Sequence, residues 1–408
     1  MPELLAPAGN FEKMKAALLY GADAVYLSGK AFGMRAAAGN FEPEELFRAF
    51  AYAHDRGKKV YLTVNVTPHT DEYDDLTSFL ELLKDSKAPD ALIVADVGVL
   101  SLARKILPDV PLHISTQAGA VSHADCTFWY EQGASRVVLA RELSLEEIRK
   151  IRRRTPDGLE LEAFIHGSMC VAFSGRCMLS HHLTGRDANR GECAQPCRWK
   201  YRLFELSEEK RPDMRLPLTE TDQGTFLFGS RDLSMIGHVG ELMTSGLSSF
   251  KIEGRMKSAY YAAVTTNAYR IAIDRYTADP AGYRFDPALA AELESVSHRA
   301  YSTGFYFDSP ADNPQLAEES GYLADKAYLA VALSYDPELK TARFVQKNKF
   351  RRGDRVELLT PGSTGRAFSV SELCDEEGNP IDCVPHPHMP FLLSVPFPVR
   401  PGDILRMG

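Results

Sequence analysis

The stretch "ELLAPAGNFEKMKAALLYGADAVYLSG" at residues 3–29 decides the fold, because it combines a strand, a helix and a second strand. Its two ends, residues 3–9 and 23–29, are short apolar runs of the kind found in covered strands. Between them, residues 10–22 have the spacing of an amphipathic helix, with Asn10 placed as its N-cap. Two parallel strands need such a crossover helix, so the stretch predicts an α/β fold.

The same rhythm continues along the chain. A second helix is expected in residues 41–58, where Pro43 suits the first helical turn. Eight strand-and-helix units, complete by the helical stretch at residues 258–276, favour a TIM-type (β/α)8 barrel. An open doubly wound sheet stays an alternative, since apolar strands show that a sheet is covered and not that it closes. The six further strand candidates are residues 59–66, 91–98, 112–119, 136–142, 161–167 and 248–255.

The pattern changes after Leu316, where short strands alternate with turn sequences. The turns are "DPELK" at 336–340, "RRGD" at 351–354 and "TPGS" at 360–363. We therefore predict a TIM-like barrel in residues 1–315, interrupted by a cysteine segment at residues 166–201. Residues 316–408 are predicted to form a small all-β barrel domain suited to binding.

From the composition we expect a cytoplasmic protein. Apolar residues make up 44% of the 408 residues, no apolar run is long enough to span a bilayer, and Glu3 stands where a leader would be basic. The net charge of -8 gives no overall attraction to nucleic acid, so any RNA must be held by local basic patches. Candidate patches are residues 152–154, 197–202 and 347–355, although solvated surface charge is the simpler explanation of each.

Four of the seven cysteines, Cys170, Cys177, Cys193 and Cys197, lie in one short segment. Only the last pair has the close spacing of a zinc knuckle, whereas an iron–sulfur cluster tolerates more varied spacing. Zinc, an iron–sulfur cluster and free thiols therefore remain open on spacing alone. Nearby histidines that could replace a cysteine ligand, or simply form hydrogen bonds, are His166, His181 and His182.

Polar residues follow most of the expected barrel strands, and the ends of such strands form the mouth where barrel enzymes place their sites. They are Asn65, Asp96, Gln117, Arg141, Glu142, His166, Lys251, Glu253 and Arg255. We expect catalytic roles for His166, Lys251 and Glu253. Substrate-binding roles are expected for Arg35, Asn65, Gln117, Arg141 and Arg255, whose guanidinium groups suit phosphate or a dicarboxylate.

A peptidase is the competing class of function. The zinc-protease motif His-Glu-x-x-His and the serine nucleophile elbow are both absent from the sequence. A cysteine nucleophile activated by His166 is conceivable, because an adjacent imidazole lowers the pKa of a thiol. That arrangement uses one cysteine and leaves three without a role.

Several of these motifs resemble peptidase family U32, the collagenase-like proteins. The resemblance rests on "HGSMCVAFSGRCMLS" at residues 166–180, "RDANRGECAQPCRWKY" at 186–201, "FKIEGRMKSAYYAA" at 250–263 and the opening stretch at 3–29. The tail is similar to the small β-barrel extension of the family. The form of the cysteine motif looks most like the members that convert the wobble uridine of tRNA to 5-hydroxyuridine.

The resemblance implies a [4Fe–4S] cluster on Cys170, Cys177, Cys193 and Cys197, and dependence on prephenate as a candidate co-substrate. It implies the anticodon loop of tRNA as substrate, with a second family member as a candidate partner subunit. The family name keeps a collagenase-like peptidase as an alternative. Hydroxylation of another RNA base, as in members that act on a ribosomal RNA cytidine, is a further alternative.

Overall fold

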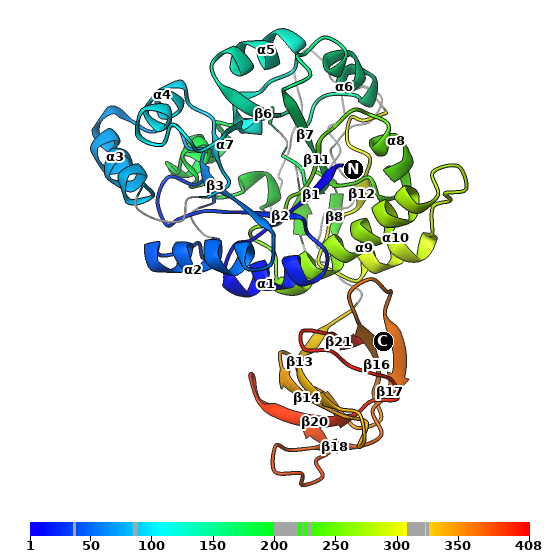
Figure 1. Cartoon of the computed structure of the whole chain (residues 1–408). Coiled ribbons are helices and arrows are strands. Elements are labelled where there is room, and N and C mark those ends of the chain that lie inside the picture. Colours follow the sequence, from blue (N-terminus) through cyan, green and yellow to red (C-terminus); the bar gives the residue numbers. More distant parts are fainter. Residues whose placement is uncertain are drawn as a thin grey trace.

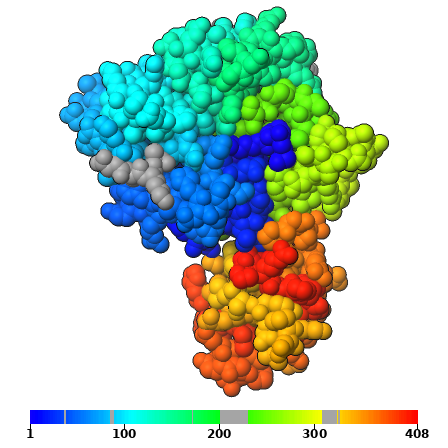
Figure 2. Space-filling view, in the orientation of Figure 1, coloured from blue at the N-terminus to red at the C-terminus, as the bar shows by residue number. Residues whose placement is uncertain are grey.

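The computed structural model describes residues 1–35, 38–84, 89–170, 172–199, 219–221, 224–226, 230–307, 323 and 326–408. These residues form a large α/β unit and a smaller all-β unit. Figure 2 shows the smaller unit, in orange and red, as a separate lobe beside the larger one. The predicted boundary between residues 315 and 316 lies outside the described residues.

Eight parallel strands close into a barrel (Figure 1). Each pairs with the next along the chain, and the last strand pairs with both the seventh and the first. The closed barrel is therefore confirmed, and the open sheet is excluded. The strands are β1 (Glu3–Pro7), β2 (Ala24–Leu27), β3 (Lys59–Val64), β4 (Ala91–Val94), β5 (Leu112–Ile114), β6 (Ala134–Val138), β7 (Glu160–Ser168) and β11 (Ser249–Ile252).

Helices cover the outside of the barrel, except α7 (Leu179–Thr184), which belongs to the cysteine segment at the barrel mouth. The expected caps are confirmed: the Asn10 side chain accepts a hydrogen bond from the Lys13 amide, and Pro43 opens its helix. The helices are α1 (Phe11–Leu19), α2 (Pro43–His54), α3 (Tyr73–Leu82), α4 (Val97–Ile106), α5 (His123–Glu131), α6 (Leu145–Arg152), α7 (Leu179–Thr184), α8 (Val239–Met243), α9 (Ala259–Ala278) and α10 (Pro287–Glu294). No described helix has the length and apolar character needed to cross a membrane.

Two short strands that the sequence did not predict extend the sheet beyond β7. β10 (Asp232–Ser234) pairs antiparallel with the end of β7, and β12 (Tyr301–Ser302) pairs parallel with β10. Asp232 lies opposite Ser168, so the cysteine segment leaves and re-enters the barrel at neighbouring positions. Between those positions, β8 (Thr219–Thr221) and β9 (Gly224–Phe226) form a separate antiparallel pair.

The C-terminal unit is an antiparallel half-barrel with its own core, which includes Leu329, Phe344, Phe391 and Leu405. The three expected turns connect strands as predicted. Its main sheet has the order β17-β16-β21-β13-β14-β20-β18, and β15 pairs with β19. The strands are β13 (Tyr328–Asp336), β14 (Thr341–Gln346), β15 (Phe350–Arg351), β16 (Arg355–Leu359), β17 (Arg366–Ser369), β18 (Leu373–Cys374), β19 (Cys383–Val384), β20 (Pro390–Ser394) and β21 (Ile404–Met407).

A buried polar contact joins the two units. Arg406 of β21 forms ion pairs of 2.7 Å with Glu292 of α10 and with Glu357 of β16. The rings of Tyr260 in α9 and Tyr328 in β13 stack beside it with centroids 5.4 Å apart. The half-barrel is therefore fixed to the outer helices of the barrel (Figure 1).

Candidate active site at the barrel mouth

A cavity of about 440 Å³ opens where the barrel strands end. All four clustered cysteines line it, from the segment that follows β7. The predicted site residues that also line it are Arg35, Asn65, Gln117, Arg141, Lys251, Glu253 and Arg255. The structure thus brings together residues from six separate regions of the sequence, and only His166 of the predicted set is missing from the cavity wall.

The cysteine segment is fastened across this mouth by contacts with the barrel loops. Glu142, after β6, accepts hydrogen bonds from the amide and hydroxyl of Ser174. Arg190 forms an ion pair of 2.6 Å with Glu72, after β3. Gly191 has a φ of 91°, and a Cβ there would lie 2.6 Å from the carbonyl oxygen of Gly33. A larger residue at position 191 would therefore push the segment off the rim.

All four clustered thiols are free. Burial raises the pKa of the Cys197 thiol; the charge of Arg198 opposes the rise, and Cys170 and Cys193 add to it. Within the described part of the chain, no three His, Cys, Asp or Glu side chains lie close enough together to hold one metal ion. His181 and His182 are exposed on α7 and do not line the cavity.

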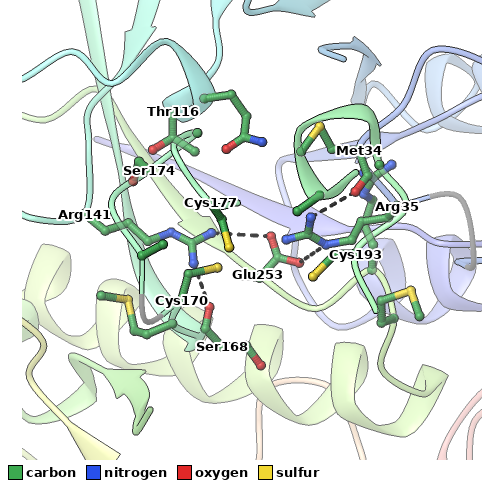
Figure 3. A pocket seen from close by; sticks show the side chains of 18 of the residues that line it. Met34, Arg35, Thr116, Arg141, Ser168, Cys170, Ser174, Cys177, Cys193 and Glu253 are labelled. Atoms are coloured by element: carbon green, nitrogen blue, oxygen red, sulfur yellow. Dashed lines mark hydrogen bonds and ion pairs between the residues drawn. The ribbon is translucent and has the colours of Figure 1, made fainter. Parts of the chain in front are cut away.

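Glu253 is the centre of the charged groups in the cavity (Figure 3). Its carboxylate lies 3.6 Å from Nη2 of Arg141 and 4.0 Å from Nε of Arg35, and the Tyr26 hydroxyl donates to it at 3.4 Å. Burial favours a raised pKa for Glu253, but the charges of Arg35, Arg141 and Arg255 outweigh burial and lower it. The carboxylate is therefore ionised at neutral pH, with Cys170, Cys177 and Cys193 around it in Figure 3.

Lys251 places a second fixed charge on the cavity floor. Its Nζ donates to Glu162 at 2.7 Å and lies 4.6 Å from the centre of the Tyr26 ring. Burial lowers the pKa of Lys251, while Glu162 opposes the change. Burial alone would raise the pKa of Glu162, but Lys251 and Arg136 bring it down to about 2. This pair stays charged, so Lys251 is suited to stabilising negative charge and not to accepting a proton.

Two arginines in the cavity have hydrogen-bonding capacity that the described protein groups do not use. Arg255 is only 3% exposed, and its guanidinium donates to the Thr63 hydroxyl at 3.3 Å without forming an ion pair among the described residues. Burial lowers the pKa of Arg255 to about 10. Arg141 donates to the Ser168 carbonyl at 2.6 Å, but its buried Nε finds no hydrogen-bond partner among the residues that the structure describes. Buried, underused donors of this kind favour an anionic ligand.

His166 lies on the opposite side of β7 from the cavity. The pairing with β11 skips Ile165, so Phe164 faces Lys251 whereas His166 faces Ile252. This bulge adds one residue to β7 and reverses the side on which the following residues lie. His166 is buried among the rings of Tyr261, Tyr269 and Tyr301. Its predicted catalytic role therefore has no support from its position.

Of the other residues at strand ends, some line the cavity and some only form structural hydrogen bonds. Asn65 accepts from the Met34 amide and donates to the Ser115 hydroxyl, so it braces two loops, while Gln117 is a half-buried wall residue. Asp96 caps α4 by accepting from two backbone amides. The sequence interpretation missed Tyr26 and Glu162, since both lie inside apolar strand stretches and only the barrel register shows which of them face inward.

The three predicted basic patches differ in how far their side chains are exposed and in what they contact. Arg152 donates to the carbonyl of Leu159, as a structural contact, while Arg153 and Arg154 are exposed. Arg198 lines the cavity, but residues 200–202 lie outside the described residues. In the half-barrel Lys347 pairs with Glu12 at 2.8 Å. Four further basic residues of this patch are exposed: Lys349, Arg351, Arg352 and Arg355.

Comparison with known proteins gives matches over both units. Residues 9–315 match the profile of Peptidase family U32, and residues 325–406 match that of the Peptidase family U32 C-terminal domain. A Bacillus subtilis protein named "tRNA hydroxylation protein P1" is 36% identical, covering 100% of this chain and 95% of its own. An Escherichia coli protein named "tRNA hydroxylation protein P" is 36% identical over 97% of this chain and 94% of its own. A Porphyromonas gingivalis protein named "Collagenase" is 32% identical over 88% and 86%.

Proposed function

Because the chain belongs to peptidase family U32, we propose that it is an RNA-modifying enzyme that hydroxylates C5 of the wobble uridine in tRNA. Two relatives named for tRNA hydroxylation align over nearly its whole length. The observation that carries the proposal is the cavity itself, which is lined by four cysteines and by a majority of basic over acidic side chains.

In this proposal Cys170, Cys177, Cys193 and Cys197 hold a [4Fe–4S] cluster. The donor set fits: four free thiols line one cavity, and each iron of such a cluster takes one thiolate. A cluster spreads its ligands over several irons, so it does not need three ligands around a single point. When bound, it supplies the electron transfer that side chains lack.

The arginines explain how the substrate would be held. Arg141 and Arg255 bring underused donors to the cavity, which suits a phosphate of the RNA or the carboxylates of prephenate as co-substrate. A base can reach this recessed site only when it is unstacked, and a base in the single-stranded anticodon loop unstacks at low cost.

Glu253 and Lys251 are the groups proposed to act on the base. Replacing hydrogen by hydroxyl at C5 is a two-electron oxidation: with water as the oxygen donor, two protons and two electrons leave, and the electrons require an oxidant from outside the chain. The ionised Glu253 carboxylate is available to accept the proton that leaves C5. Lys251, held charged by Glu162, stabilises negative charge that develops on the uracil oxygens. The enclosing cysteine segment limits the access of water to both groups.

The test joins metal analysis to nucleoside analysis. The full chain is purified anaerobically, and iron, sulfide and visible absorption are measured for wild type, Cys193→Ala and the control Cys374→Ala, which lies in the half-barrel. About four irons per chain, lost only in Cys193→Ala, is the expected result. The same variants are then expressed in a strain lacking the gene, and 5-hydroxyuridine in its tRNA should return with wild type and Cys374→Ala only.

The peptidase alternative makes the opposite prediction. No histidine is found among the described residues of the cavity wall, so none of the four thiols has an imidazole partner there. Cleavage of unfolded collagen by metal-free protein, together with unchanged tRNA nucleosides in the deletion strain, would restore that alternative.

A further inference from the structure

Large apolar side chains are exposed on the cysteine segment, whose four cysteines line the cavity, and in the loop after β11. Phe173 is 42% exposed and Trp199 is 40% exposed, both on the cysteine segment. Met178 and Leu183 of the same segment are exposed as well, as is Met256 in the loop after β11. None of these side chains contributes to the barrel core, so their exposure has no structural explanation.

The charge of the cavity is opposite to that of the whole chain. Among the described residues, seven basic side chains line it against two acidic ones, whereas the full chain carries a net charge of -8. The basic residues are Arg35, Arg141, Arg186, Arg198, Lys251, Arg255 and Lys257, and the acidic ones are Glu142 and Glu253. A basic groove combined with exposed aromatic rings is the combination that binds single-stranded nucleic acid.

Both aromatic rings are held in place by their surroundings. The Trp199 indole nitrogen donates to the Ala194 carbonyl at 3.0 Å, which ties the ring to the loop between Cys193 and Cys197. Phe173 lies beside Gly119, after β5, and the next residue is anchored to Glu142. Rings that are already ordered lose little conformational entropy when a base stacks on them.

We propose that Phe173 and Trp199 are stacking surfaces for unpaired bases of a single-stranded RNA loop whose target base enters the cavity. This inference rests on the proposed function and adds the residues that select a loop over a duplex. Stacking needs an exposed base face, which a loop offers and a paired stem does not. The basic cavity then holds the phosphate of the inserted nucleotide.

The test measures affinity by fluorescence anisotropy, using the full chain purified anaerobically. Two labelled RNAs are compared, an anticodon stem-loop and a blunt duplex of the same composition. Phe173→Ala and Trp199→Ala should each weaken stem-loop binding at least about fivefold and leave duplex binding unchanged. Phe128→Ala, which removes an exposed ring on α5, is the matched control and should bind as wild type does.

Conservative variants separate stacking from a structural role. Trp199→Phe loses the hydrogen bond to Ala194 but keeps a ring, so stacking predicts nearly wild-type affinity. Phe173→Leu keeps apolar bulk but loses the ring, so it should bind as weakly as Phe173→Ala. Equal affinities for all variants, or Trp199→Phe as weak as Trp199→Ala, would overturn the inference while tRNA hydroxylation by wild type still stood. Failure of wild type to bind the stem-loop would overturn both proposals.

Discussion

Glu253 is the carboxylate that offsets the positive charges of three arginines in the cavity. It faces Arg35 and Arg141, and Arg255 adds a third positive charge to its surroundings. Without the carboxylate, three guanidinium groups would repel one another across a buried space. The residue therefore has an electrostatic role in addition to its proposed role as proton acceptor.

Replacing Glu253 by Gln should keep the side-chain volume and remove both roles. We expect 5-hydroxyuridine in tRNA to fall about 100-fold or more, in line with the loss of a general base. The measurement is nucleoside analysis of tRNA from a deletion strain that expresses the variant. Glu131→Gln, at an exposed position at the end of α5, is the control. Wild-type levels of the nucleoside in Glu253→Gln would show that Glu253 is not required.

His166 should control acid stability. Burial lowers the pKa of its imidazole to about 3 from an ordinary value of 6.5. Between these values the unfolded chain binds a proton that the folded chain does not, so stability falls as pH drops from 6.5 toward 3, by up to about 1.4 kcal/mol per pH unit. His166→Phe keeps an aromatic ring and should show a shallower fall in denaturant unfolding at pH 7, 6 and 5. Equal slopes in the two proteins would mean that His166 is not the titrating group.

The sequence predicted a site residue only where the residue belonged to the cysteine cluster or directly followed an expected strand. The four cysteines stood out by clustering, and Lys251, Glu253 and Arg255 by following a strand. His166 followed a strand in the same way, but a one-residue bulge at Ile165 turned it away from the cavity. A bulge depends on pairing with a distant strand, and no local pattern around residue 165 encodes that pairing.

At the scale of elements, β7 is where barrel and cysteine segment meet. Gly167, near its end, has a φ of 110°, and a Cβ there would lie 2.3 Å from the carbonyl oxygen of Glu253. Only glycine combines that backbone conformation with that close approach. The strand thus sets the position of the Glu253 backbone directly.

Gly167→Ala should have two effects: it should destabilise the protein, and it should displace the backbone of Glu253. The strained backbone alone costs about 1–3 kcal/mol, and the contact with Glu253 adds to that cost. Gly57→Ala is the matched control, since its φ is 65° and no atom lies within 4 Å of the new Cβ. Denaturant unfolding should show a clearly larger loss for Gly167→Ala. Equal losses would mean that β7 yields locally without moving Glu253.

The long regular elements were predictable, whereas the short ones were not. Continuous apolar strands and capped helices repeat eight times, and that repetition identified the barrel. β10 and β12 have three and two residues, too few for any periodicity, and form because the end of β7 offers unpaired backbone groups.

For the molecule as a whole, Arg406 couples the half-barrel to the barrel. Its guanidinium is almost fully buried between Glu292 and Glu357. Arg406→Ala removes the ion-pair partner of the buried Glu292, while Glu357 keeps its pair with Lys326, and should lower stability by about 3–5 kcal/mol. Calorimetry should then resolve two unfolding transitions, one for each unit. Arg343→Ala, which removes an exposed pair with Glu376, should cost no more than about 1 kcal/mol. A single transition with unchanged midpoint in Arg406→Ala would show that other contacts join the units.

The pairing of Ser168 with Asp232 has a consequence for the order of assembly. The chain leaves the sheet at Ser168 and rejoins it at Asp232, and these two residues pair with each other. The pairing of β11 with β7 and β1 therefore does not require contacts made by the cysteine segment. Barrel closure and maturation of the cysteine segment are topologically independent steps. If the proposed cluster is present, the barrel can therefore fold first and receive iron and sulfide afterwards.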